Sequence, residues 1–243
     1  GSQLRFFRSL YVNMTDEQGV QTREHPNSIT TWIDGSSVYG SSVETSNWLR
    51  TFEDGKLKVS PNPWGDLLPV AQDDDQTAPP MSFVGFSADV RFIAGDSRAN
   101  EHIALMALHV LFIREHNRLA EDIAERNPDW SDEDIFQLAR KLVAAQIQAI
   151  TYEEFLPSLG VTLAPYSGYN STINPEVTSS FATVAFRMGH SQTGDVFLRL
   201  DESREPIENG VMDLFDGFWT TRPVTEEGGI APILRGVAAQ TQA

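Results

Sequence analysis

Cysteine is absent from the 243-residue sequence. The chain can therefore form no disulfide, thiolate nucleophile, cysteine zinc site or cysteine-held iron–sulfur cluster. The sequence also contains no run of about 18 apolar residues, so we expect no membrane span. At this length a chain can bury a core without disulfides, and the missing cysteines leave the cellular compartment open.

Basic residues are scarce as well. The sequence has 18 Lys and Arg against 34 Asp and Glu, which gives a formal net charge of −16. Proteins that bind nucleic acid or anionic membrane surfaces usually do so through clustered Lys and Arg. We therefore expect neither nucleic acid nor an anionic membrane as a partner.

The distribution of Pro, Gly and apolar residues divides the chain in two. Residues 1 to about 95 are interrupted by Pro and Gly, which predicts long ordered loops. Dense apolar residues then predict a helix from Arg98 to about Arg126, with Asp96 or Ser97 as its N-cap. It should end before Asn127–Pro128, because proline disfavours helical geometry in the preceding residue.

Weaker patterns follow the first helix. Ser131 and three acidic residues predict the start of a second helix, and residues 180–189 a third. Residues 196–200 could form a brief strand or a buried turn, whereas residues 212–219 form a short amphipathic segment and residues 230–234 an apolar stretch. The predicted fold class is mainly α, with long ordered loops and little β.

Three of the five histidines, His102, His109 and His116, are spaced by seven residues on the predicted helix. Neighbours in this trio lie roughly 10 Å apart along the axis, and metal–nitrogen bonds of about 2 Å cannot bridge them. Ordinary helix histidines are thus favoured at His109 and His116. Arg98, Glu101 and His102 share a face, and spacing alone favours a surface salt bridge between Arg98 and Glu101.

Several stretches in one order resemble the animal-type haem peroxidase superfamily, which includes the cyclooxygenases. These stretches are residues 6–9 (FFRS), 30–41 (TTWIDGSSVYGS), 94–101 (AGDSRANE), 108–109 (LH), 114–120 (REHNRLA), 186–190 (FRMGH) and 227–236 (EGGIAPILRG). Together they extend over residues 4 to about 238. The resemblance implies the helical peroxidase fold, and the lack of cysteine favours a bacterial-type member.

The resemblance assigns a haem b cofactor and its contacts. It implies that His190 is the axial ligand of the haem iron and that Arg187 pairs with a haem propionate. Arg98 matches the distal arginine, whose charge stabilises peroxide as its O–O bond breaks. Glu101 matches a carboxylate that some relatives esterify to the haem, and the sequence leaves that link open. His102 stands where a subgroup has a methionine bonded to a haem vinyl, so we expect no such bond.

The resemblance also implies a calcium loop. Thr30, Asp34 and Ser36 offer side-chain oxygens, and Thr30 and Trp32 can offer backbone carbonyls. In extended backbone, alternate positions point to one side, and hard oxygen ligands suit Ca²⁺.

Two parts of the family pattern are missing. The upstream segment that carries the distal histidine is absent, and so is the C-terminal half. We therefore expect residues 1–243 to form part of a single peroxidase domain, with the missing remainder as a partner. A natural short relative that binds haem poorly is the alternative, but Arg98, Glu101, Arg187 and His190 favour a piece of a complete enzyme.

The implied function is reduction of hydrogen peroxide with oxidation of halides or small aromatic donors, in an extracellular or periplasmic setting. Two alternatives stay open. One is a non-enzymatic, calcium-stabilised interaction module, and the other is a haem-dependent fatty-acid dioxygenase.

Overall fold

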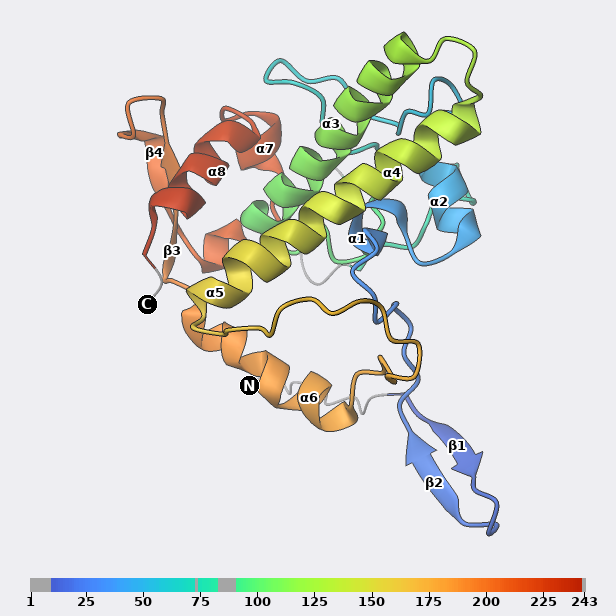
Figure 1. Ribbon diagram of the computed structural model, residues 1–243. Helices are drawn as coiled ribbons and strands as arrows, with labels where there is room; N and C mark the ends of the chain where they lie inside the picture. The colour runs from blue at the N-terminus through green and yellow to red at the C-terminus, as the bar shows by residue number, and fades with distance from the viewer. Residues whose placement is uncertain (1–9, 73, 83–90, 242–243) are drawn as a thin grey trace.

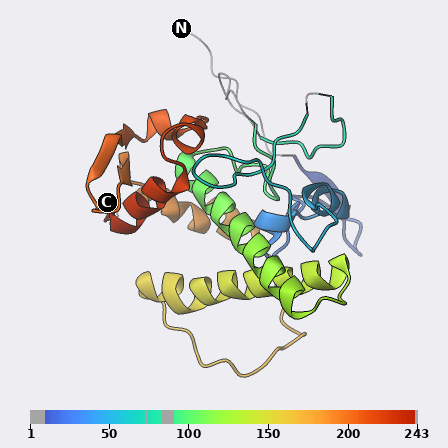
Figure 2. The same cartoon turned by 90° about the horizontal axis from the view of Figure 1, so that it is seen from above.

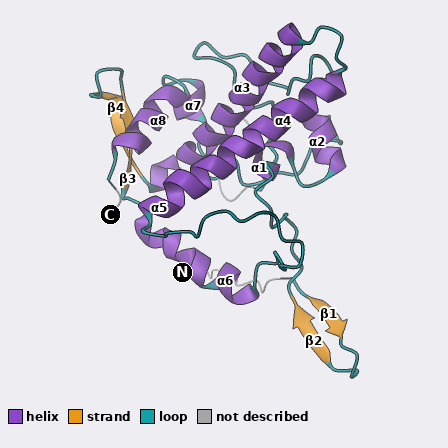
Figure 3. Cartoon of the chain, in the orientation of Figure 1, coloured by secondary structure: helices purple, strands orange, loops and turns teal. Residues whose placement is uncertain are grey.

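The computed structural model describes residues 10–72, 74–82 and 91–241. The matching stretch at residues 6–9 lies outside the described residues. Helices dominate the described part, and the strands form two small antiparallel hairpins (Figure 1 and Figure 3). The predicted mainly α fold class is confirmed.

The elements fall into four groups along the chain. The N-terminal group is β1 (Val12–Thr15), β2 (Gln21–Glu24), α1 (Ser36–Tyr39) and α2 (Val43–Leu49). The central group is α3 (Ile103–Arg126), α4 (Asp132–Ala149), the π-helical turn η1 (Ile150–Phe155) and α5 (Leu156–Ser158). The next group is α6 (Ser179–Thr183) and the 3₁₀ helix η2 (Ala185–Gln192). The C-terminal group is β3 (Val196–Leu200), β4 (Pro206–Asp213), η3 (Phe215–Gly217), α7 (Arg222–Thr225) and α8 (Ile230–Ala239).

Two long helices, α3 and α4, form the centre of the molecule and cross in the view of Figure 2. α3 ends at Arg126, before its C-cap Asn127, as predicted, and α4 begins after the N-cap Ser131, whose hydroxyl accepts from the Asp134 N–H. Ile103, Met106 and Val110 of α3 are completely buried. This face of α3 packs into the core. The segment that leads into α3 is thereby held in a fixed position.

The predicted start of α3 was wrong. The helix begins at Ile103, and His102 is its N-cap in extended backbone (φ −151°, ψ 160°). Asp96 does not cap it, because its Oδ1 accepts the Arg98 N–H at 2.8 Å, two residues away. The local bond holds residues 97–101 in turns, so Arg98 and Glu101 precede the helix and do not share its first turn.

The C-terminal group is a hairpin covered by a helix. Residues 196–200 form β3, which settles the alternatives in favour of a strand, and β3 pairs with β4. Residues 212–219 divide between the end of β4 and η3 and do not form one amphipathic segment. The apolar stretch at 230–234 is the first half of α8, which lies against β3 and α3.

The segment between α5 and β3 stays outside the core. The third predicted helix is divided into α6 and η2, because Val184 leaves helical geometry (φ −125°, ψ −68°). Residues 161–190 are exposed throughout. Figure 1 shows α6 and η2 below the α3–α4 pair and the β1–β2 hairpin extending away from the rest.

Candidate functional site

A tight turn at residues 95–101 holds Arg98. The Asp96 carboxylate receives two bonds from the guanidinium: Nε donates to Oδ1 at 2.9 Å and Nη2 donates to Oδ2 at 2.6 Å. The contact raises the pKa of Arg98 and lowers that of Asp96, in both cases chiefly through the shared hydrogen bonds. Arg98 is thus a fixed cation with a side chain that is 55% exposed.

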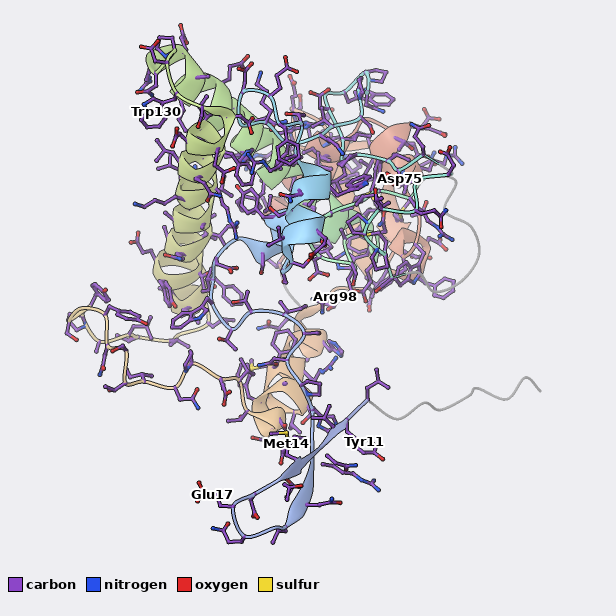
Figure 4. The ribbon with its side chains drawn as sticks, turned by 90° about the vertical axis from the view of Figure 1, so that its right-hand side faces the viewer. Tyr11, Met14, Glu17, Asp75, Arg98 and Trp130 are labelled. Carbon is purple, nitrogen blue, oxygen red and sulfur yellow. The ribbon has the colours of Figure 1, made fainter. Side chains whose placement is uncertain are left out.

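Two further contacts fix the backbone of this turn. The buried Asn100 side chain accepts from the Phe92 N–H and donates to the Phe92 carbonyl oxygen, at 3.2 and 2.8 Å. The Trp219 N–H donates to the Glu101 carbonyl oxygen at 3.0 Å. In Figure 4, Arg98 lies at the edge of the helical body that faces the α6–η2 segment. The turn therefore presents Arg98 and Glu101 from a rigid base.

His102 closes this turn and begins α3. Its Nδ1 accepts the Leu105 N–H at 3.2 Å, and its ring stacks on Phe197 with centroids 5.6 Å apart. Burial lowers the pKa of His102, and the nearby Glu101 partly offsets this. The imidazole is neutral at pH 7 and serves as a helix cap.

The other two histidines of the trio lie inside the protein. His116 is completely buried, and its two nitrogens meet the Tyr39 hydroxyl and the Gly55 carbonyl oxygen at 2.8 Å each. His109 bonds the Leu105 carbonyl oxygen through Nδ1. Within the described ranges, no group of three or more His, Cys, Asp or Glu could hold a metal. The expectation of ordinary helix histidines agrees with these contacts.

The predicted calcium loop is a folded turn before α1. The Thr30 hydroxyl accepts the Trp32 N–H at 3.1 Å, and Asp34 Oδ1 accepts the Ser36 N–H at 3.0 Å. Thr30 and Asp34 line a polar cleft of about 670 Å³ that lies between this loop, α2 and α4. Asp34 Oδ2 makes no hydrogen bond to any described residue. A carboxylate oxygen is therefore free beside the cleft.

Arg187 and His190 lie on η2 and are exposed. Neither side chain makes a hydrogen bond or an ion pair with any part of the chain that is described. Three neighbours are exposed apolar residues: Val184 at 72%, Phe186 at 62% and Met188 at 62%. η2 thus carries a free imidazole and a free guanidinium on an uncovered apolar segment.

The predicted site residues lie in three groups: the turn that holds Arg98, the predicted calcium loop and η2. The structure brings the first two together. A Cβ on Gly95 would lie 2.6 Å from the Ser36 carbonyl oxygen, so the turn that holds Arg98 packs directly on the predicted calcium loop. No hydrogen bond, ion pair or ring contact between described residues joins η2 to either group. Sequence reasoning missed Asp96 as the partner of Arg98, although their separation of two residues was available as a signal.

A family model described as animal haem peroxidase matches residues 1–243. Human lactoperoxidase is 36% identical over 249 residues, which cover 99% of this chain and 35% of that protein. The peroxidase mlt-7 of Caenorhabditis elegans is 38% identical, over 89% of this chain and 30% of that protein. The chain spans about a third of the length of these two curated relatives.

Solved structures agree with these relatives. Peroxidase A of Dictyostelium discoideum matches with a TM-score of 0.87 and 31% identity, over 98% of this chain and 47% of that chain. A fatty acid alpha-dioxygenase of Oryza sativa matches with a TM-score of 0.69 and 22% identity, over 96% of this chain and 41% of that chain. The second match is evidence for the fold alone. Among the described residues, no helix is both long and apolar enough to span a membrane.

Proposed function

Since this chain belongs to the animal haem peroxidase family, we propose that it is the part of a haem-dependent peroxidase that carries the distal arginine, the proximal histidine and the calcium loop. The complete enzyme would reduce hydrogen peroxide and oxidise halides or small aromatic donors. The observation that carries the proposal is Arg98, held by Asp96 at an exposed edge beside Glu101. A cation in a fixed place is what a developing negative charge on peroxide oxygen requires.

The side chains of η2 fit a haem b group. A histidine that binds iron must offer a free ring nitrogen, and neither nitrogen of His190 is taken by a described residue. Arg187 would pair with a propionate, and the exposed Phe186 and Met188 suit a flat apolar ring system. When bound, the haem supplies the redox chemistry of its iron.

Other residues of this chain act on the substrate and the cofactor edge. Arg98 would bind and orient peroxide by charge, and Asp96 keeps the guanidinium from turning away. The carboxylate of Glu101 makes no hydrogen bond within the described ranges, so it is free for the ester link to haem found in some relatives. Proton transfer from peroxide would depend on the distal histidine, which belongs to the missing remainder.

The loop before α1 fits Ca²⁺. It offers the Thr30 and Ser36 hydroxyls, the Trp32 carbonyl and the free oxygen of Asp34, all of them hard ligands. These supply fewer than the 6–8 oxygens that Ca²⁺ takes, and the missing remainder would add the others. We infer an extracellular or periplasmic setting from the family. The bacterial-type assignment stays a prediction, since the relatives named above come from animals and Dictyostelium.

The first experiment is a visible spectrum after haemin is added to the calcium-loaded chain. A Soret band that shifts or disappears in His190→Ala, and persists in His25→Ala, supports axial ligation. His25 is a suitable control because it is an exposed histidine far from α3 and η2 in sequence. If the chain takes up no haem, the peroxidase proposal fails for this chain and the non-enzymatic calcium module replaces it.

A second measurement separates the two haem enzymes of this fold. The haem-loaded chain, combined with the missing remainder, should oxidise guaiacol with peroxide and leave fatty acids unchanged. Oxygenation of fatty acids without peroxide would favour the dioxygenase, whose likeness to this chain rests on fold.

Chelation tests the calcium loop. We expect a chelator to lower the melting temperature, and Asp34→Asn to lower it in calcium buffer and to make it insensitive to the chelator. A melting temperature that is indifferent to chelator in the unaltered chain would contradict the calcium assignment.

A further inference from the structure

The sequence contains two tripeptides of the type that accepts an N-linked glycan. In this pattern an Asn is followed by any residue except Pro and then by Ser or Thr. The two tripeptides are residues 13–15 (NMT) and residues 170–172 (NST). Such tripeptides also arise by chance, so the pattern alone identifies no modified residue. The structure places the two in different surroundings, and this difference distinguishes them.

The first tripeptide belongs to a paired strand. Residues 13–15 lie in β1, and each of them is paired with a residue of β2 in the antiparallel hairpin. An enzyme that modifies Asn13 has to take the tripeptide into its own active site. In the folded chain this requires β1 to separate from β2, which makes Asn13 the less accessible acceptor.

The second tripeptide lies in the long loop between α5 and α6, outside every helix and strand and fully within the exposed part of the chain. Figure 2 shows this loop projecting from the α4 side of the molecule. Oδ1 of Asn170 accepts the Thr172 N–H at 3.0 Å and the Thr172 hydroxyl at 2.7 Å. Nδ2 makes no hydrogen bond to any described residue, so the nitrogen that would carry a sugar is free.

We propose that Asn170 is the acceptor of an N-linked glycan when the chain passes through a glycosylating secretory pathway. The donor is an oligosaccharide carried on a lipid diphosphate, and a transferase of the host supplies the catalysis. A bond forms between Nδ2 of Asn170 and C1 of the first sugar, and the bond from C1 to the diphosphate oxygen breaks. Nδ2 loses one proton, and the lipid diphosphate leaves with the electron pair of the broken bond.

The contacts of Asn170 suit this transfer. An amide nitrogen is a poor nucleophile because its lone pair is delocalised onto the carbonyl oxygen. Two donors on Oδ1 stabilise negative charge on that oxygen, and hydrogen bonds that polarise a group in this way make the loss of a proton from Nδ2 easier. Both donors come from Thr172, the residue that defines the tripeptide.

A glycan at Asn170 also has a consequence for the surface around it. Exposed Tyr166, Tyr169 and Ile173 flank the tripeptide. A glycan is bulky and solubilising, so it would cover these side chains and keep molecules from associating through them. It also requires this loop to stay on the surface of the complete domain. The inference rests on the proposed extracellular setting, but not on haem binding.

The test is secretion of the chain from a eukaryotic host, followed by a glycosidase that removes N-linked glycans. We expect the enzyme to increase the gel mobility of the chain by one step. Removal of the glycan converts its Asn to Asp, so in water labelled with heavy oxygen the peptide that contains residue 170 should gain the label. Asn170→Gln should abolish both signals.

Matched variants separate the tripeptide from the loop around it. Thr172→Val should abolish the glycan, whereas Thr172→Ser keeps a hydroxyl and should retain it. Asn174→Gln changes a second asparagine of the same loop that lies outside the pattern, and it should retain the glycan, as should Asn13→Gln. The loop is exposed, so all these variants should fold and melt like the unaltered chain.

The outcomes separate this inference from the proposed function. An unlabelled Asn170 in the secreted chain, beside a second secreted protein that is glycosylated normally, overturns the inference. So does a label confined to Asn13, or one that persists at Asn170 in Thr172→Val. A chain that takes up no haem refutes the proposed function and leaves the glycan result valid.

Discussion

At the scale of single residues, His116 makes stability depend on pH. Its ring is completely buried between Tyr39 and Gly55, and burial lowers its pKa to about 4. The unfolded chain, with an ordinary histidine pKa of about 6.5, binds the proton more readily than the folded chain. Stability is therefore lost as pH falls from about 6.5 to about 4, by about 3 kcal/mol across the window.

Urea denaturation at pH 7.0 and 4.5 measures this loss. Carboxylates also titrate in this pH range. The quantity compared among the proteins is therefore the change in unfolding free energy between the two pH values. His116→Gln should be less stable at pH 7 and show a clearly smaller change with pH, whereas His25→Gln should keep the wild-type change. Equal changes in all three proteins would show that His116 does not contribute.

The second prediction at this scale concerns the substitution of Gly95. A Cβ there would lie 2.6 Å from both the Ser36 carbonyl oxygen and the Val38 carbonyl carbon, and backbone atoms cannot yield cheaply. Gly95→Ala should destabilise the chain by about 1–3 kcal/mol, the usual cost of overpacking. Gly189→Ala is the matched control, because a Cβ there meets nothing within 4 Å. Similar urea midpoints for the two variants would contradict the close packing of the turn on the proposed calcium loop.

At the scale of elements, His102 tests the corrected start of α3. His102→Ala removes the side chain that accepts the Leu105 N–H, and a lost N-cap costs about 1 kcal/mol. His102→Asn keeps an acceptor but, like alanine, loses the stacking on Phe197. The difference in unfolding free energy between the two variants thus reports the cap, and equal stabilities would place the start of α3 elsewhere.

The sequence predicts those element boundaries that depend on local chemistry. Pro128 and Ser131 fix the end of α3 and the start of α4, because a proline and a capping hydroxyl act over one turn. The start of α3 was missed because two good capping residues, Asp96 and Ser97, stand ahead of the real cap. Asp96 instead satisfies the Arg98 N–H, a choice set by tertiary contacts of the turn.

At the scale of the whole molecule, the sequence proposes residues for the site but does not report how they assemble. The resemblance proposes Arg98, His190 and Asp34 through motifs that a single sequence displays. The packing of Gly95 on Ser36 depends on two segments about 60 residues apart in sequence, and no local pattern reports it. The apolar side chains of η2 are largely exposed, so no packing among the described residues accounts for its position.

This uncovered segment gives the last prediction. If, as proposed, the rest of a peroxidase domain covers η2, Met188 should change from reactive to protected when that part is supplied. Met188 is 62% exposed here, close to Met14 at 54%, whereas Met106 is completely buried. Peroxide oxidation followed by mass spectrometry should modify Met188 and Met14 at similar rates in the isolated chain and spare Met106. In the longer protein the rate at Met188 should fall at least tenfold, because a buried thioether is shielded from the oxidant. An unchanged rate at Met188 would mean that η2 stays on the surface and that His190 is not enclosed in a haem pocket.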